Sequence, residues 1–245
     1  MSTREKIGQI LMLDVRNWGK NAAGEPENVT VLPAELAKVV TDYRLGSVIL
    51  FRENFINTPQ SYQLIQDLQK ASYQLPLLIS TDQEGGYVTR LREGTEMPGN
   101  MALSATRNES MAQGVGEVHG AELNALGVHI NFAPVLDVNT NQNNPVIGEW
   151  RQTDLVPFKN AVENGLDAVL TAHIIVPALD DTKVISKKDG TEIGLPATLS
   201  KKIISGILRD ELKFKGLVFT DAMDMGAIAD NFGASEATEM ALMAG

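Results

Sequence analysis

The sequence has 245 residues, of which 43% are hydrophobic and 21% charged, and its formal net charge is −10. It contains no long basic run and no apolar stretch of membrane-spanning length, so we expect neither a nucleic acid nor a membrane as partner. It has no cysteines and three histidines, which excludes disulfides and thiolate metal sites and disfavours a multi-histidine zinc site.

The first residues, MSTREKIGQILML, predict a short helix rather than a targeting signal. Ser2 and Glu5 fit a capping box at the start of that helix. The order of charged, apolar and small residues that marks a signal peptide is missing, so the chain as written is expected to be cytoplasmic. An export signal that had been removed would leave no trace here.

Short apolar runs recur along the chain and are typical of strands that are covered on both faces. They are rich in Val, Ile, Leu and Phe and show no polar alternation. The runs are Ile10–Leu13, Gly46–Phe51, Leu75–Ser80, Val128–Leu136, Ala168–Thr171 and Leu217–Thr220.

Helical segments are predicted between these runs. Thr58 is the expected N-cap of the first, with Pro59 at the first helical position, and Gly127 is the expected C-cap of the second. The predicted helices are Thr58–Ala71, Asn108–Leu126, Thr153–Asn164, Ser200–Leu212 and Ser235–Ala244.

The alternation of strand and helix predicts an α/β fold with a parallel sheet. Two closures of such a sheet are open, a (β/α)₈ barrel and a doubly wound open sheet. Six core strands are counted, whereas a full barrel needs eight, so the pattern alone does not choose. The polar segment Asp180–Pro196, after the fifth of these strands, is predicted to be an extended loop, with a small hairpin as the alternative.

Polar groups follow four of the predicted strands directly. In parallel α/β folds the active groups gather at the C-terminal ends of strands, so these four are the candidate site residues. They are Asp82, Asp137, His173 and Asp221.

Asp221 lies in the stretch FTDAMDMGA and has two interpretations of about equal weight. It is either the N-cap of a following turn or a chemical group, because a carboxylate on a rigid strand end can attack an anomeric carbon, bind a metal or take a proton. Asp224, three residues later, is expected to lie in the following turn or on the surface.

Asp82 lies in the stretch STDQEGGYVTRL, and Arg90 is close enough in the chain to return to the same strand end. An Asp with an Arg suits a ligand with many hydroxyls, and a purely structural ion pair is the alternative. Gly85 and Gly86 allow positive φ or close approach of the backbone, and Glu84 is expected to be a supporting group rather than a catalyst.

The histidines carry weaker signals. His173 is as often a satisfied core histidine as a pocket residue, and we predict that it contacts substrate. His119 and His129 are expected to be structural, and Asp137 is expected to anchor a loop. No phosphate-binding glycine-rich motif occurs.

Four motifs, taken together and in order, resemble the N-terminal catalytic barrel of glycoside hydrolase family 3, in its bacterial β-N-acetylhexosaminidase branch. They are STDQEGGYVTRL, GVHINFAPVLDVNTNQNNPVIGE, AVLTAHIIVPALD and KGLVFTDAMDMGAI. The resemblance extends from about Glu5 to Gly245. It implies a retaining glycosidase with a (β/α)₈ barrel, Asp221 as the nucleophile, and Asp82 and Arg90 as sugar-binding groups. It also implies that no metal and no organic cofactor is needed.

The resemblance also implies an acid/base that this sequence lacks. In this branch an Asp–His pair on a loop after the fifth strand does that work, in a segment of the form KHFPGHG followed by DSH. Here Glu149 is followed directly by Trp150, which begins the helix before the family's sixth strand.

The resemblance therefore implies one barrel domain, residues 1–245, that lacks the segments of strands five and eight, between 149 and 150 and after 245. Either the sequence omits parts of a complete enzyme, or a real deletion has removed the acid/base. The first is favoured, because a barrel without an interior strand would expose unpaired backbone edges.

The implied substrate is a terminal β-linked N-acetylglucosamine, from peptidoglycan or related sugars. A sugar-binding barrel with impaired catalysis is one alternative, and a β-glucosidase or β-xylosidase of the same family is another. A metal-assisted hydrolase using Asp82, His173 and Asp221 is a weaker rival. The sequence leaves the exact sugar and the oligomeric state open.

Overall fold

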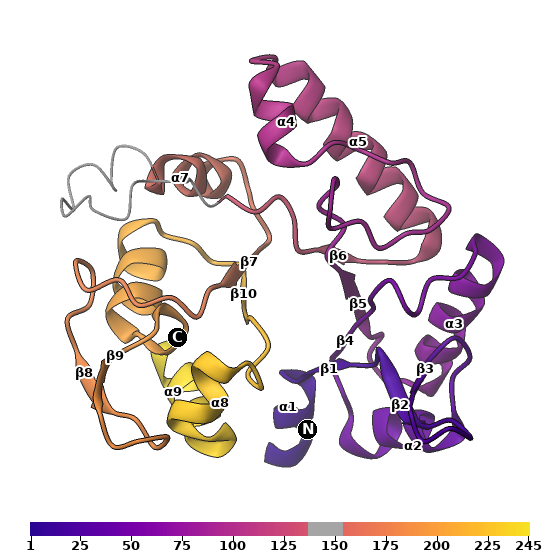
Figure 1. Cartoon of the computed structure of the whole chain (residues 1–245), viewed down its shortest axis with the longest axis horizontal. Helices are drawn as coiled ribbons and strands as arrows, with labels where there is room; N and C mark the ends of the chain where they lie inside the picture. Colours follow the sequence, from indigo (N-terminus) through magenta and orange to yellow (C-terminus); the bar gives the residue numbers. More distant parts are fainter. Residues whose placement is uncertain (137–153) are drawn as a thin grey trace. The chain divides into compact units, whose positions relative to one another are not determined.

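The computed structural model describes residues 1–136 and 154–245, which belong to two compact units, Met1–Val135 and Leu136–Gly245 (Figure 1). Each unit has its own parallel strands and its own cluster of buried apolar side chains.

The first unit is built around a four-stranded parallel sheet with the order β1-β4-β5-β6. Four of the six predicted apolar runs form these strands, as the absence of polar alternation indicates. The strands are β1 (Met12–Asp14), β4 (Ser47–Ile49), β5 (Leu78–Thr81) and β6 (Ile130–Asn131). The other elements of the unit are α1 (Thr3–Gln9), β2 (Asn17–Lys20), β3 (Pro26–Asn28), α2 (Ala34–Tyr43), α3 (Thr58–Ala71), α4 (Asn100–Ala105) and α5 (Glu109–Leu126).

The core of this unit lies between the sheet and its helices. Val48 and Ile79 on neighbouring strands are fully buried and pair in register. Apolar side chains of α2, α3 and α5 pack in the same cluster, which removes their apolar faces from water. Those helical residues are Leu36, Val40, Leu64, Ile65, Leu68, Leu123 and Leu126.

Capping residues set the helix ends largely as predicted. Ser2 and Glu5 form the reciprocal capping box of α1, and Gly127 ends α5 with a φ of 88°. The N-cap of α3 is Asn57 and not Thr58, because Asn57 has the extended backbone and its side chain accepts a hydrogen bond from Gln60 N.

The polar side chain of Asn54 is fully buried and ties three parts of the first unit together. Its amide donates to the carbonyls of Val15 and Val29, and its oxygen accepts from Phe51 N. A buried amide that satisfies backbone groups in this way fixes the chain after β4 against the segments that flank the β2–β3 hairpin.

The second unit contains the remaining two predicted strands, β7 (Ala168–Thr171) and β10 (Leu217–Thr220), which pair in parallel from Ala168↔Leu217 to Thr171↔Thr220. Leu170 is 41% exposed and Leu217 is 51% exposed, so the expectation of strands covered on both faces is wrong for this pair. In the described part of the chain β7 and β10 form a two-stranded sheet, and a side chain on so small a sheet has few neighbours to cover it.

The second unit also contains helices, a 3₁₀ turn and two further strands. They are α7 (Leu155–Glu163), β8 (Lys183–Ile185), β9 (Glu192–Gly194), the 3₁₀ turn η1 (Ala197–Leu199), η2 (Lys202–Glu211), α8 (Gly226–Phe232) and α9 (Ala234–Ala244). β8 and β9 form an antiparallel hairpin, so the hairpin alternative for Asp180–Pro196 is confirmed and the plain loop is wrong. η2 is a π-helix, in which Leu212 N donates to Ile207 O.

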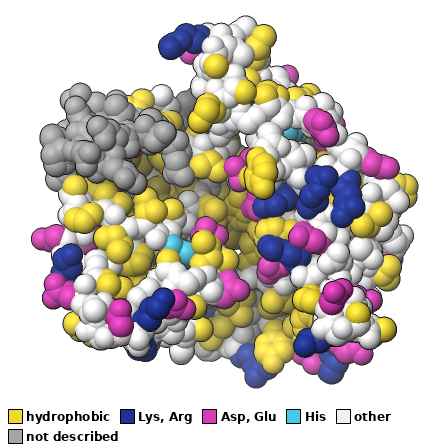
Figure 2. Space-filling model, viewed as in Figure 1, with side chains coloured by type: hydrophobic (Ala, Val, Ile, Leu, Met, Phe, Trp, Pro, Cys, Tyr) yellow, Lys and Arg dark blue, Asp and Glu magenta, His cyan; other side chains and the backbone are white. Residues whose placement is uncertain are grey.

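The surface in Figure 2 carries small groups of basic side chains beside acidic ones, with apolar side chains between them. This mixture agrees with a chain of net charge −10 that has no long basic run. Within residues 1–136 and 154–245, no helix has the length and apolar character needed to cross a membrane.

Candidate active site

Asp82 directly follows β5, a strand that is hydrogen-bonded to neighbours on both sides. Arg90 Nη2 lies 2.8 Å from Asp82 Oδ2, so Arg90 returns to the same strand end, as the sequence predicts. Both side chains keep some exposure, 26% for Arg90 and 20% for Asp82, so the pair can still reach a ligand. A guanidinium and a carboxylate together offer directional, charge-assisted hydrogen bonds to hydroxyl groups.

Gln83 organises this loop and was not predicted. It is fully buried, and its side-chain oxygen accepts from Arg90 N at 2.7 Å and from Leu91 N at 3.2 Å. Its backbone is held by the amide of Asn131 on β6, which accepts from Gln83 N and donates to Gln83 O. The only signal in the sequence was its place between two acids in the motif.

The two glycines of the motif meet the structural requirement that the sequence predicts. Gly85 and Gly86 have φ of 89° and 60°, and a Cβ on Gly85 would lie 2.7 Å from Pro98 O. Gly86 N donates to Met97 O at 2.7 Å. The loop therefore approaches the backbone of residues 97–99 more closely than a side chain would allow.

Two guanidinium groups lie over the ring of Phe51, a residue that follows β4. The guanidinium carbon of Arg16 lies 3.8 Å from the ring centroid and that of Arg90 lies 5.2 Å from it. Both distances are within the range of cation–π attraction. Arg90 is thus held by Asp82, by Gln83 and by an aromatic face.

Asp221 follows β10, and Asp221 N donates to Thr171 O on the paired strand β7. The side chain is half-buried, and its Oδ1 accepts from Ala222 N at 2.7 Å. α8 begins five residues later with Met225 as its N-cap, so Asp221 does not cap that helix. Asp224 is exposed, as expected.

His173 lies in the same unit and is joined to the loop of Asp221. Its Nε2 is 3.0 Å from Ala222 O and its Nδ1 is 3.0 Å from Thr198 Oγ1. Thr198, which is 2% exposed, was not predicted, and its position in the segment GLPATLS gave no chemical signal. The structure therefore brings Asp82 together with Arg90 in one unit, and Asp221 together with His173 in the other.

The other two histidines, His119 and His129, lie in structural positions. His129 Nδ1 accepts from Ile79 N, and His119 on α5 is buried, which lowers its pKa because burial disfavours the charged ring. Asp137 and Glu149 lie outside the described residues. Among the described residues, no three or more His, Cys, Asp or Glu side chains are grouped so that they could hold a metal ion.

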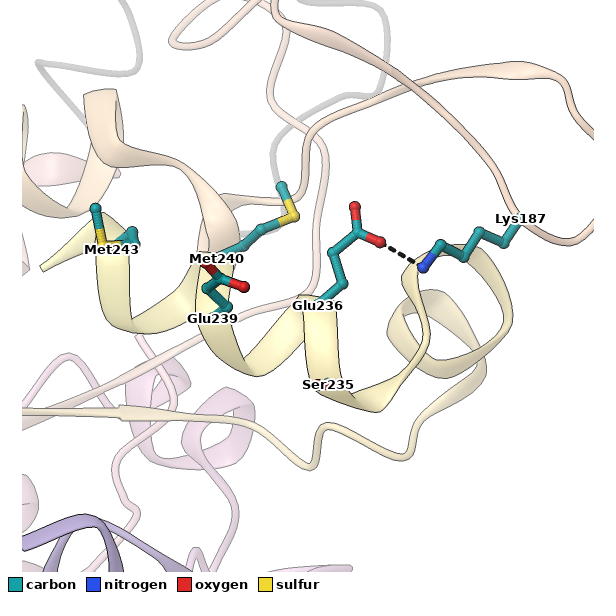
Figure 3. Close-up of a pocket in the computed structure, with 6 residues that line it drawn as sticks. All are labelled: Lys187, Ser235, Glu236, Glu239, Met240 and Met243. Carbon is teal, nitrogen blue, oxygen red and sulfur yellow. Dashed lines mark ion pairs between the residues drawn. The ribbon is translucent and has the colours of Figure 1, made fainter. Parts of the chain in front are cut away.

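A surface hollow of about 630 Å³ lies along α9 and contains none of the predicted site residues (Figure 3). Its lining consists of Lys187, Ser235, Glu236, Glu239, Met240 and Met243. Glu236 points toward Lys187 and forms an ion pair with it. The carboxylates of this hollow are on an exposed helix rather than at a strand end, so the hollow does not mark the predicted chemistry.

Parallel strands with carboxylates at their C-terminal ends define the class of α/β enzymes whose sites lie at that edge of the sheet. A family model, the glycosyl hydrolase family 3 N-terminal domain, matches residues 2–151 and 148–245. The chain therefore belongs to glycosyl hydrolase family 3.

Similar proteins share this family. Beta-hexosaminidase A of Pseudoalteromonas piscicida is 34% identical over 308 residues, which cover 97% of this chain and 51% of that protein. A family 3 β-N-acetylglucosaminidase from Paenibacillus sp. str. FPU-7 has a structure that matches all of this chain and 54% of its own, with 31% identity and a TM-score of 0.85. The chain thus spans about half the length of these two relatives.

A third similar structure is NagZ from Neisseria gonorrhoeae in complex with N-trifluoroacetyl-D-glucosamine. It covers 96% of this chain and 79% of its own with a TM-score of 0.74, and at 22% identity it shows the fold alone. By its family model and its relatives, the chain has an α/β fold that matches family 3 N-terminal domains, and the relatives named here are a beta-hexosaminidase and a β-N-acetylglucosaminidase.

Proposed function

We propose that this protein is a retaining exo-glycosidase that hydrolyses terminal β-linked N-acetylglucosamine through a covalent intermediate on Asp221. The observation that carries the proposal is the placement of Asp221. It is fixed at the end of β10 by hydrogen bonds of its backbone and its Oδ1, and it does not cap the following helix. A carboxylate that rigid backbone holds at a strand end is suited to attack on carbon.

The reaction proceeds in two displacements. The Asp221 carboxylate attacks the anomeric carbon, the bond from that carbon to the leaving oxygen breaks, and a glycosyl ester forms. Water then attacks the same carbon, the ester bond breaks, and N-acetylglucosamine leaves with the carboxylate restored. Two inversions give net retention.

Asp82 and Arg90 bind sugar hydroxyls remote from the reacting carbon in this proposal. Their ion pair and the ring of Phe51 hold the fork of Arg90, and Gln83 holds its backbone N–H, before substrate arrives, which lowers the entropy cost of orienting the sugar. Direct binding of substrate by a His173 ring nitrogen would require one of its two hydrogen bonds to break.

We further propose that the complete enzyme is a (β/α)₈ barrel and that this sequence omits an internal segment with the acid/base. Two observations support the omission. The family model matches in two parts that meet at residues 148–151, and the alignment with the Pseudoalteromonas protein has 308 positions for a chain of 245, so at least 308 − 245 = 63 positions have no residue here. An intact mass above that calculated from the 245 residues would support the omission, and an equal mass would refute it.

Substrates from peptidoglycan and a cytoplasmic location belong to the same proposal.

The assigned sugar is tested with a panel of aryl glycosides of N-acetylglucosamine, glucose and xylose with activated leaving groups, which depart without protonation. Release from the N-acetylglucosaminide supports the proposal, and faster release from glucose or xylose would refute the assigned sugar.

A sugar-binding barrel with impaired catalysis is the second candidate, because the sequence lacks the segment that would protonate the leaving group. It predicts binding of N-acetylglucosamine in calorimetry with no release from any aryl glycoside.

A further inference from the structure

The peptide groups on both sides of Ala222, the residue after Asp221, are fixed by hydrogen bonds. Its N–H donates to Asp221 Oδ1 at 2.7 Å. Its carbonyl accepts from Met225 N at 3.1 Å and lies 3.0 Å from His173 Nε2. The orientation of the Asp221 carboxylate therefore depends on a backbone carbonyl that His173 holds from the neighbouring strand end.

The position of the imidazole proton follows from these partners. A backbone carbonyl only accepts, so His173 Nε2 must carry a proton to bond with Ala222 O. The other ring nitrogen, Nδ1, lies 3.0 Å from the hydroxyl oxygen of Thr198. Thr198 therefore contacts the ring on the side away from the bond to Ala222 O and holds its orientation.

Thr198 is itself fixed in place. Its Oγ1 donates to Ala172 O at 2.9 Å and accepts from Thr171 Oγ1 at 3.1 Å, both at the end of β7. Ala197 N donates to Ile174 O, which binds the η1 turn to the same segment. A side chain that is 2% exposed and surrounded in this way has little freedom to move.

We propose that His173 and Thr198 are positioning residues for the Asp221 nucleophile. Thr198 holds the ring of His173 at Nδ1, His173 Nε2–H holds the carbonyl of Ala222, and Ala222 N–H orients the carboxylate that attacks. This inference rests on the proposed function, and it assigns His173 an action through the backbone in place of direct contact with substrate.

The test compares Thr198→Val, which keeps the shape and removes the hydroxyl, with the matched control Thr198→Ser, which keeps the hydroxyl. With an activated dinitrophenyl N-acetylglucosaminide, the Val variant is expected to lose about 10- to 100-fold in kcat, because small misplacements of a reacting group cost rates of that order. Its KM and its dissociation constant for N-acetylglucosamine are expected to stay within about twofold, and the Ser variant is expected to retain most of the wild-type kcat.

A second pair tests His173 itself. His173→Gln offers an amide donor toward Ala222 O, whereas His173→Leu offers none. The Gln variant is therefore expected to retain a higher kcat than the Leu variant, while both bind N-acetylglucosamine equally well. Nitrogen spectra of the histidine rings in the wild-type protein are expected to show a proton on Nε2 of His173. This measurement does not depend on catalysis or on any variant folding.

The outcomes separate the two proposals. If the wild type releases no aryl alcohol, the proposed function fails, while the ring spectra still test the hydrogen-bond scheme. If the wild type is active, the positioning role is refuted by equal kcat in the Val and Ser variants, by equal loss of binding and kcat, or by the absence of a proton on His173 Nε2. Thermal unfolding of each variant checks that the fold is intact, and if the Val variant does not fold, the Gln and Leu pair decides.

Discussion

Asp180 and Asp181 are adjacent, bind the same lysine and differ in burial, so together they form a matched test of the second unit. Asp180 is 3% exposed and accepts from Ser200 Oγ at 2.5 Å, from Thr182 N at 3.0 Å and from Lys202 Nζ at 3.0 Å. Asp181 is 85% exposed and accepts from Lys202 Nζ at 2.9 Å. The substitutions are Asp180→Asn and Asp181→Asn, which both remove one charge at nearly constant shape.

The expected magnitudes follow from these contacts. Hydrogen bonds to a charged group contribute about 1.5–3 kcal/mol, and an asparagine at position 180 can keep the bond from Thr182 while it loses the carboxylate bond to Ser200. The ion pair with Lys202 adds little, because the lysine is 56% exposed and solvent screens it. We expect Asp180→Asn to lower the free energy of unfolding by about 2–3 kcal/mol and Asp181→Asn by about 0.5 kcal/mol or less.

The assay is urea unfolding at neutral pH followed by circular dichroism, with the slope against urea compared between variants. Equal losses for the two variants would refute the assignment of the stability to the buried carboxylate. A changed slope would show that the substitution had altered the unfolded or native state as a whole rather than one interaction.

The pH dependence of the same pair gives a second check. Burial by itself raises the pKa of Asp180, but the hydrogen bonds from Ser200, Thr182 and Lys202 outweigh it and leave the pKa well below its ordinary value. A carboxyl whose pKa is lowered by folding gives stability that is full above the ordinary value of about 3.9 and is lost as the pH falls toward the folded value. The difference between wild type and Asp180→Asn should therefore be constant from about pH 7 to 5 and shrink below about pH 4.

Three further substitutions test the first unit. Gly85→Ala is expected to destabilise by about 1–3 kcal/mol in urea unfolding, because the residue has positive φ and its Cβ would meet the carbonyl of Pro98. Arg90→Lys is expected to weaken binding of N-acetylglucosamine by about tenfold in calorimetry, because lysine lacks the planar fork, and Arg92→Lys is the control that should change little. Asn54→Asp is expected to cost at least about 2 kcal/mol, because the aspartate cannot donate to two buried carbonyls, and no loss of stability would contradict its role.

Much of the secondary structure could be predicted from the sequence because its signals are local. Each of the six apolar runs contains or overlaps a strand, and Gly127 ends its helix since a glycine tolerates the left-handed backbone there. The N-cap of α3 was misplaced by one residue because Asn57 and Thr58 both have capping side chains, and only the backbone conformation decides between them. Burial was overestimated at Leu217, since cover on a strand comes from neighbours that a local pattern does not contain.

The candidate site was partly predictable for the same reason. Asp82 and Asp221 stand at the ends of apolar runs, and Arg90 is close enough in the chain to return to Asp82. Gln83 and Thr198 were missed because a buried amide and a buried hydroxyl carry no pattern in sequence. Their roles arise from hydrogen bonds to groups that the fold brings beside them.

Covalent trapping of the nucleophile tests the central claim most directly. A fluorinated glycosyl fluoride of N-acetylglucosamine has a leaving group that needs no acid, and its ring fluorine slows hydrolysis of the ester, so the intermediate should accumulate. After digestion, mass spectrometry is expected to find one sugar on the peptide that contains Asp221, and none in the Asp221→Asn protein. A sugar on Asp224 or on any other carboxylate, or labelling that persists in Asp221→Asn, would contradict the account.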